Sequence, residues 1–305
     1  MLNNQNSVDE TITMREFIWQ HKLICFFRNI DFPGFRKLSL LLPKWLLPEV
    51  EKVGEHILVT PAGLKLWINP SKDQGVERSL FETGTYERGT LDFMKRFLNS
   101  GDTFVDVGAN IGLMSMVAKK AVGKSGRVWA FEANRNTFDI LEKNLTLNQY
   151  DEVLCFECGL GAKRETKLLF DNLSINRGAA STVFEGKNAK STEISILTLD
   201  EVANQQEIIP SMIKIDVEGM EEEVLIGAES VIKNYRPILI VEFSAERGDN
   251  SREKVYNKIL SLTDYKFFKL KGSKERSSKL LEIKTMQDLP VDDNVFCLPI
   301  EKLEK

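Results

Sequence analysis

The sequence predicts an α/β protein with a doubly wound, mostly parallel sheet, preceded by an N-terminal extension that contains a helix and a hairpin. Three observations lead to this prediction. Strand-like and helix-like segments alternate between about residues 100 and 243, which is typical of parallel sheets with right-handed crossovers. The segment 238–243 is almost wholly apolar, as expected for a strand buried on both faces. A glycine-containing turn follows the first strand, at the place where open α/β sheets bind ligands.

Composition narrows the class of protein. The 305 residues are 42% apolar and 28% charged, which fits a globular chain. The net charge of −4 argues against a dedicated nucleic-acid-binding protein, which usually carries a basic excess. Four cysteines are too few for a disulfide scaffold. The apolar runs are too short for a membrane span, and the polar N-terminus is unlike a secretory signal, so we expect a cytoplasmic protein.

The predicted extension covers residues 1–75 and the main domain residues 76–300. Residues 1–10 are expected to be a disordered leader. Apolar residues at helical spacing predict a helix over 14–30, and a turn at 61–63 predicts a hairpin of strands 56–60 and 64–68.

Two interpretations remain open for residues 11–48. This segment holds six Lys and Arg against two Asp and Glu, and it contains Trp19 and Trp45. Basic residues beside tryptophans are typical of a peripheral membrane contact. The preferred interpretation is an amphipathic cap that packs on the core of the protein.

The main domain alternates strands and helices in a regular order. Two further segments near the C-terminus are expected to add an antiparallel pair at the edge of the sheet. The predicted strands are 103–107, 127–131, 152–157, 212–217, 238–243, 265–270 and 294–298, and the predicted helices are 112–121, 137–149 and 220–233.

The turn after the first strand holds four candidate cofactor-binding residues: Asp106, Gly108, Asn110 and Gly112. At Gly108 any side chain would occupy the space of a ligand, and Gly112 lets the following helix start close to the sheet. A dinucleotide-binding G-x-G-x-x-G motif would have a glycine at the position of Asn110. An NAD-dependent oxidoreductase is therefore the disfavoured alternative.

Further candidates follow the second and third strands. Glu132 comes directly after the second strand, where a carboxylate can accept two hydrogen bonds from ribose hydroxyls. The alternative is that Glu132 caps the next helix. Cys158 and Gly159 lie where such folds often contact adenine. Cys155 and Cys158 form one C-x-x-C motif without a second pair, so core packing is expected rather than a zinc site.

Acidic residues follow the fourth and fifth strands. Lys214, Asp216 and Glu218 alternate along one strand face, and buried carboxylates need a cation to offset their charge. Asp216 and Glu218 are the catalytic candidates, and Asp216 is also a cofactor-binding candidate. Glu242 ends the fifth strand on the same rim and is a candidate substrate contact. A divalent cation held by the three carboxylates stays open, but no metal site is predicted because sequence alone does not bring them together.

Five motifs in this order resemble the FkbM family of S-adenosylmethionine-dependent methyltransferases, over about residues 76–243. The motifs are Phe81–Glu87, Asp106–Gly112, Phe131-Glu132, Leu199-Asp200, and Lys214–Glu221 with its continuation to Gly227. The resemblance implies a seven-stranded, Rossmann-like methyltransferase fold, S-adenosylmethionine as cofactor, and methylation of a hydroxyl on a sugar, glycan or related small molecule.

The resemblance also implies further site residues. Glu82, Tyr86 and Glu87 would line the cofactor site, and a loop near the acceptor would contribute Asn176 and Ser181. A nearby carboxylate can take the proton of an alcohol as the new bond forms, and Asp216 or Glu218 is the hypothesis for that base. A module that binds the cofactor or a glycan without turnover is the remaining alternative. The basic segment 269–279 is expected to be a solvated hairpin loop.

Overall fold

The computed structural model describes residues 13–30, 33–171, 190–245 and 251–303. Contacts within the chain divide it into two compact units, Met1–Thr85 and Tyr86–Lys305. The expected boundary after residue 75 stays a prediction, and the expected leader, residues 1–10, lies outside the described residues.

The first unit combines a small sheet with helices. Strand β2 pairs antiparallel with β3, with His56 opposite Ile68, which confirms the predicted hairpin, and β1 adds to β2 in parallel. The elements of this unit are β1 (Met14–Glu16), α1 (Ile18–Asn29), α2 (Pro33–Leu46), the 3₁₀ turn η1 (Val50–Lys52), β2 (His56–Val59), β3 (Lys65–Ile68) and α3 (Val76–Thr83).

The helices of this unit differ from the prediction in two respects. The helix predicted over 14–30 begins only at Ile18, because Met14–Glu16 pair with β2 as strand β1. A second helix, α2, was not predicted, and it has Pro33 as its first residue. Proline suits that position, since the first N–H groups of a helix have no partner inside it.

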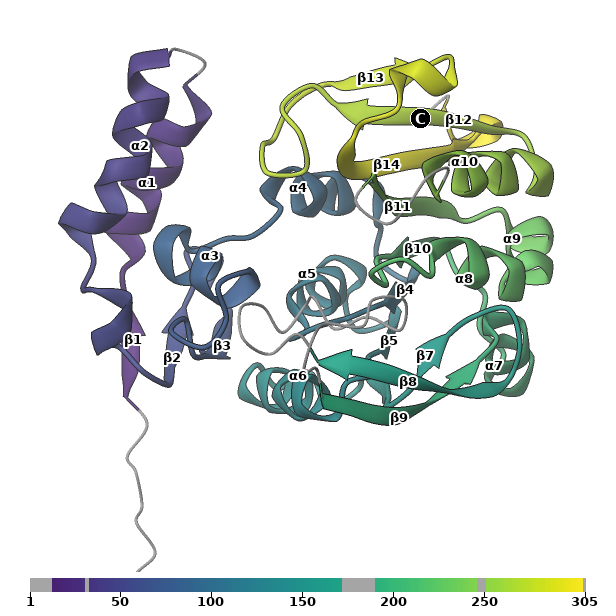
Figure 1. Ribbon diagram of the computed structural model, residues 1–305, viewed down its shortest axis with the longest axis horizontal. Helices are drawn as coiled ribbons and strands as arrows, with labels where there is room; N and C mark the ends of the chain where they lie inside the picture. The colour runs from purple at the N-terminus through teal and green to yellow at the C-terminus, as the bar shows by residue number, and fades with distance from the viewer. Residues whose placement is uncertain (1–12, 31–32, 172–189, 246–250, 304–305) are drawn as a thin grey trace, which may run out of the picture. The chain divides into compact units, whose positions relative to one another are not determined.

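The second unit is built on an eight-stranded sheet with the order β13-β12-β14-β11-β10-β4-β5-β6 (Figure 1). Its strands are β4 (Thr103–Val107), β5 (Arg127–Phe131), β6 (Leu154–Phe156), β10 (Met212–Ile215), β11 (Ile238–Ser244), β12 (Tyr265–Leu270), β13 (Leu280–Ile283) and β14 (Asp292–Pro299). The five strands from β6 to β11 run parallel, and β14 is antiparallel to both β11 and β12. The seven predicted strands are all present, and β13 adds an eighth beside β12.

A second, three-stranded sheet was not predicted. It has the order β7-β9-β8, and its strands are β7 (Gly159–Leu160), β8 (Glu165–Asp171) and β9 (Lys190–Leu197). The remaining elements of this unit are α4 (Arg88–Phe97), α5 (Leu113–Val122), α6 (Arg135–Leu147), α7 (Leu199–Gln206), α8 (Glu221–Gly227), α9 (Glu229–Tyr235), α10 (Ser251–Leu262) and the 3₁₀ turns η3 (Met286–Asp288) and η4 (Ile300–Lys302). The single helix predicted over 220–233 is divided into α8 and α9 at Ala228.

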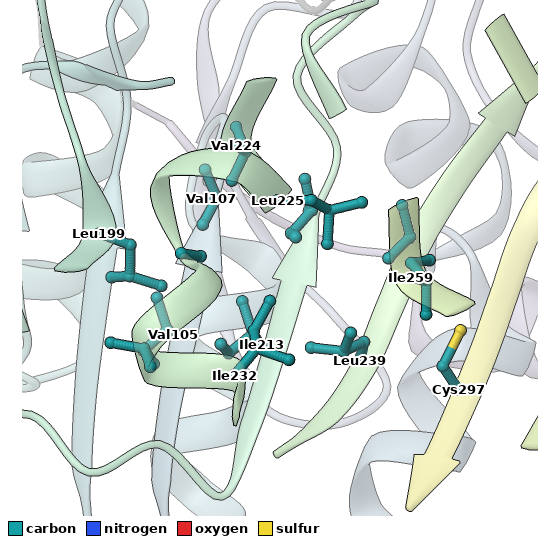
Figure 2. Packing of buried hydrophobic residues seen from close by; sticks show 14 of the residues in the cluster. Val105, Val107, Leu199, Ile213, Val224, Leu225, Ile232, Leu239, Ile259 and Cys297 are labelled. Carbon is teal, nitrogen blue, oxygen red and sulfur yellow. The ribbon is translucent and has the colours of Figure 1, made fainter. Parts of the chain in front are cut away.

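The core lies on both faces of the large sheet. Figure 2 shows one face, where side chains of α7 to α10 pack on alternate strand residues such as Val105, Ile213 and Leu239. On the other face α5 packs against β4 and β5, and the ring of Phe93 on α4 lies 4.3 Å from that of Phe296 on β14. Helices on both faces confirm the doubly wound fold. Because helices cover both faces of the sheet, a ligand site is expected at the carboxyl ends of the parallel strands, where polar side chains can lie close together. We call this the carboxyl edge of the sheet.

Candidate active site

The turn between β4 and α5 requires glycine at two positions. Gly108 has a φ of +82°, and a Cβ atom there would lie 1.8 Å from the carbonyl oxygen of Asp216. The neighbouring backbone therefore already excludes a side chain at Gly108, and close approach of a ligand to this turn stays a prediction. At Gly112, φ is +89° and a Cβ would lie 2.5 Å from Leu141 of α6, so this glycine permits contact with a helix rather than with the sheet.

Asp106 lies one residue before the end of β4 and points toward α5. It is fully buried, and the hydroxyl of Ser115 donates a hydrogen bond of 2.6 Å to its Oδ2. Burial raises the pKa of this carboxyl, and the nearby ammonium of Lys214 opposes that shift. Asp106 thus holds β4 to the first turns of α5, and its direct contact with a cofactor stays a prediction.

Glu132 connects the two loops that follow β4 and β5. Its Oε2 accepts a hydrogen bond from the backbone N–H of Asn110 and its Oε1 one from the backbone N–H of Asn134, both at 2.9 Å. Asn110 adopts a φ of +50°, which directs its N–H toward the carboxylate. The side-chain cap of α6 is Asn134, whose Oδ1 accepts from the N–H groups of Asn136 and Thr137. Glu132 is therefore directed toward the turn at 108–112, as ribose binding would require.

The environment of Glu132 changes its acidity. Burial raises the pKa of this carboxyl to about 7, although the N–H groups of Asn134 and Asn110 favour the ionised form. The carboxylate and the carboxylic acid are therefore both populated near neutral pH.

Three carboxylates meet at the carboxyl ends of β10 and β11, and we call them the acidic cluster. Oxygen atoms of Asp216, Glu218 and Glu242 all lie within 4.8 Å of one another. The ammonium of Lys214 lies 2.7 Å from Oδ2 of Asp216, so a lysine offsets part of the negative charge, as the buried-charge argument requires. Glu218 has a φ of +55°, in a turn whose N–H groups at Val217 and Gly219 donate to Glu221.

A second lysine reaches the acidic cluster from the loop between β12 and β13. Nζ of Lys274 lies 2.8 Å from Glu242 and 3.2 Å from Glu87, which is fully buried. Asn294 of β14 also donates a hydrogen bond of 2.8 Å to Glu87. Burial acts to lower the pKa of Lys274, but the surrounding carboxylates, Glu87 foremost, raise it well above its ordinary value. The expectation that 269–279 is merely a solvated loop is wrong for Lys274, and its local sequence carries no signal of this burial.

The remaining predicted residues fall into three groups. Tyr86 lies in the second unit beside Glu87; burial raises the pKa of its hydroxyl, and the charges of Glu87 and Asp216 act in the same direction. Glu82 lies in the first unit, on α3, where it pairs with Arg78, and it has no defined position relative to the site. Asn176 and Ser181 lie outside the described residues.

Cys158 belongs to the hydrophobic core, and burial raises the pKa of its thiol to about 11. The four cysteines are free thiols, so the C-x-x-C motif forms no disulfide. A Cβ atom on Gly159 would lie 2.7 Å from Ile196 of β9 and 3.6 Å from Ala133, the residue after Glu132. Contacts of Cys158 and Gly159 with adenine stay predictions.

The charges of this edge suit a cationic nucleoside ligand. Glu87 and the acidic cluster supply four carboxylates against the two ammonium groups of Lys214 and Lys274. Carboxylates at this edge can contact the cationic groups of a ligand, such as the sulfonium and ammonium of S-adenosylmethionine. Glu132 would add a hydrogen-bond acceptor for ribose hydroxyls beside the turn at 108–112. The residues present therefore fit this cofactor.

Comparison with known proteins gives the class. The family model of the methyltransferase FkbM domain matches residues 106–267, just over half of the 305 residues. The matched segment begins at the end of β4 and contains β5, β10 and β11 with Glu132 and the acidic cluster. The fold and this match define a methyltransferase domain. The chain belongs to the FkbM methyltransferase family.

Two curated relatives carry different acceptors in their names. The chain is 30% identical over 162 residues to the hexuronic acid methyltransferase AglP of Haloferax volcanii, covering 52% of this chain and 64% of AglP. It is 27% identical over 134 residues to the ribosomal protein L11 methyltransferase of Lachnoclostridium phytofermentans, covering 42% of this chain and 40% of that protein. The matches thus span less than two thirds of either relative.

Among solved structures, the chain is similar to a methyltransferase FkbM from Methylobacillus flagellatus. The two share 19% identity with a TM-score of 0.45, over 92% of this chain and 58% of the other.

Proposed function

We propose that this protein transfers a methyl group from S-adenosylmethionine to a hydroxyl of a sugar, a glycan or a related small molecule. The observation that carries the proposal is the acidic cluster with its two lysines, placed at the same sheet edge as Glu132 in an FkbM domain. The similarity to a hexuronic acid methyltransferase supports a sugar acceptor. The family match leaves the oxidoreductase alternative without support.

Some residues of the site would bind the cofactor, and others would take the proton of the acceptor hydroxyl. S-adenosylmethionine supplies an electrophilic methyl group on a positive sulfur. Glu132 would accept hydrogen bonds from the ribose hydroxyls, and Glu87 and Tyr86 would lie beside the cationic part of the cofactor. Holding two reactants in line contributes much of the rate in such a transfer.

Asp216 and Glu218 would have different roles. The ammonium of Lys214 lies 2.7 Å from Oδ2 of Asp216 and stabilises the negative charge of that carboxylate, which suits contact with a cationic group. We therefore assign Asp216 to the cationic part of the cofactor and Glu218 to the proton of the acceptor hydroxyl. Glu242 would complete the acceptor side, held in place by Lys274.

The test combines a binding measurement with a transfer assay. Binding of S-adenosylhomocysteine and of NAD is measured by calorimetry, and radiolabelled methyl transfer is measured with glycosides of hexuronic acids and neutral hexoses. We expect binding of S-adenosylhomocysteine but not NAD, and transfer to at least one glycoside. Binding without transfer to any acceptor would instead favour the non-catalytic module.

Variants separate the two carboxylates. In Glu218→Gln we expect methyl transfer to fall at least 100-fold, in the range of general-base catalysis, with S-adenosylhomocysteine affinity changed less than about threefold. In Asp216→Asn we expect that affinity to fall about tenfold, as for a lost hydrogen bond to a charged group. Glu222→Gln, in the first turn of α8, serves as the matched control. Full binding and turnover in both site variants would refute these roles.

A further inference from the structure

The helices α1 and α2 expose large apolar side chains, and we call these six residues the hairpin surface. The exposed fraction is 63% for Trp19, 61% for Phe26 and 68% for Trp45. The hairpin surface consists of Trp19, Leu23 and Phe26 on α1, and of Leu40, Leu41 and Trp45 on α2. The α1 residues are spaced four and three apart, so they form one stripe along that helix.

The hairpin surface is not the side by which these helices join their own unit. His21 and Ile24 of α1 are fully buried, and Leu42 of α2 is nearly so. Nε2 of His21 lies 2.8 Å from the carbonyl oxygen of Phe81 on α3, which ties α1 to the rest of the unit. Packing as an amphipathic cap therefore explains the buried residues of α1 and α2. It does not explain why the apolar residues of the hairpin surface are exposed.

The charges near the hairpin surface are mostly basic. Lys22 and Lys44 are exposed and lie in sequence between residues of the hairpin surface, and Arg28 occupies the last turn of α1. Residues 11–48 hold six basic and two acidic residues, although the whole chain carries a net charge of −4. Tryptophan, phenylalanine and leucine beside lysine are typical of helices that lie in the headgroup region of a membrane.

We propose that the hairpin surface binds the anionic lipid surface of a membrane, with α1 and α2 lying in the interface plane. The exposed apolar side chains would enter the acyl boundary, and Lys22 and Lys44 would contact lipid phosphates. No helix of the described chain is long and apolar enough to span a bilayer, so the attachment would be peripheral. The proposal is independent of the acceptor, since it concerns only residues of the first unit.

The test is co-sedimentation of the full chain with vesicles at 150 mM NaCl. One set of vesicles contains phosphatidylcholine alone, and the other contains 30% phosphatidylglycerol. We expect at least tenfold tighter binding to the anionic vesicles. Replacing Trp19, Phe26 and Trp45 together by serine should weaken that binding at least tenfold. The matched control, Ile209→Ser with Val291→Ser, removes two equally exposed apolar side chains of the second unit and should bind like the wild type.

Charge and tryptophan environment give two further readouts. Lys22→Gln with Lys44→Gln should lower binding to anionic vesicles by roughly tenfold or more, since each lysine near such a surface contributes about fivefold. The fluorescence of Trp19 and Trp45 is obtained by subtracting the emission spectrum of a Trp19→Phe, Trp45→Phe variant from that of the wild type. Without vesicles, acrylamide should quench this fluorescence. With vesicles, its emission maximum should shift to shorter wavelength.

Several results would overturn the proposal. Absence of vesicle binding, or equal binding by the serine variant, would do so. If acrylamide fails to quench Trp19 and Trp45 without vesicles, the protein itself covers the hairpin surface. A dimer in sedimentation velocity that the serine substitutions dissociate, without vesicle binding, would assign the surface to a second copy of the chain.

Discussion

Protonation of Glu132 is expected to control cofactor affinity near neutral pH. Burial raises the pKa of this carboxyl to about 7, and ribose hydroxyls donate to the ionised form. As the pH falls through 7, the protonated form accumulates and loses acceptor capacity. Affinity should therefore be high above pH 7 and fall below it.

The magnitude follows from the ionised fraction. With a pKa of about 7, roughly 90% of Glu132 is ionised at pH 8 and roughly 10% at pH 6. If only the ionised form binds ribose, affinity falls about tenfold between pH 8 and pH 6, which corresponds to about 1.4 kcal/mol.

The assay is calorimetry with 5′-methylthioadenosine, which carries adenine and ribose but no amino or carboxyl group. Glu132→Gln should bind about 10- to 100-fold more weakly at pH 8, because it loses a hydrogen bond to a charged group. This variant should show no pH dependence between pH 6 and pH 8. Glu157→Gln, which removes an exposed carboxylate paired with Arg135, should keep the wild-type slope. A flat wild-type profile, or the same slope in Glu132→Gln, would refute the assigned role.

Three further predictions concern the turn at Gly108, the ion pairs of Lys274 and the need for a metal ion. Gly108→Ala should destabilise the fold by about 3 kcal/mol, measured by urea unfolding, because its Cβ meets a backbone oxygen. Gly101→Ala, with a similar positive φ but only Ser125 within 4 Å, should cost about 1 kcal/mol, and equal costs would contradict the steric argument. Lys274→Met should cost about 3 kcal/mol, because buried Glu87 and Glu242 lose its ammonium group, whereas Lys271→Met, on the same loop but exposed, should change stability by less than about 0.5 kcal/mol. Methyl transfer should survive dialysis against EDTA, since lysines already offset the acidic cluster, and activity restored only by Mg²⁺ would instead make that cluster a metal site.

The sequence predicted the sheet well because buried strands carry a local signal. Strands β4 and β5 lie at their predicted residues, and β10 and β11 differ only at their ends. A parallel strand that is buried on both faces requires a run of apolar residues between two turns. This pattern can be recognised without knowing which strands lie beside it in the sheet. The turn at 108–112 is similarly local.

The sequence could not predict contacts that depend on strand order. Lys274 follows β12, and Glu87 lies almost 190 residues earlier, before β4. They meet because β14 brings Asn294 beside Glu87, and because the β12–β13 loop carries Lys274 to the same edge. The backbone obstruction at Gly108 was missed for the same reason, since the obstructing carbonyl belongs to Asp216, directly after the adjacent strand β10.

The position of β14 has a consequence for how the protein is made. This strand follows the other strands of the large sheet along the chain, yet it lies between β11 and β12. Until the ribosome has synthesised β14, β11 and then β12 lack this partner and present open hydrogen-bonding edges to other nascent chains. Asn294 arrives with the same strand, so Glu87 obtains its amide partner only when this gap closes. Completion of the sheet and assembly of the charged edge should therefore be a single late event in biosynthesis.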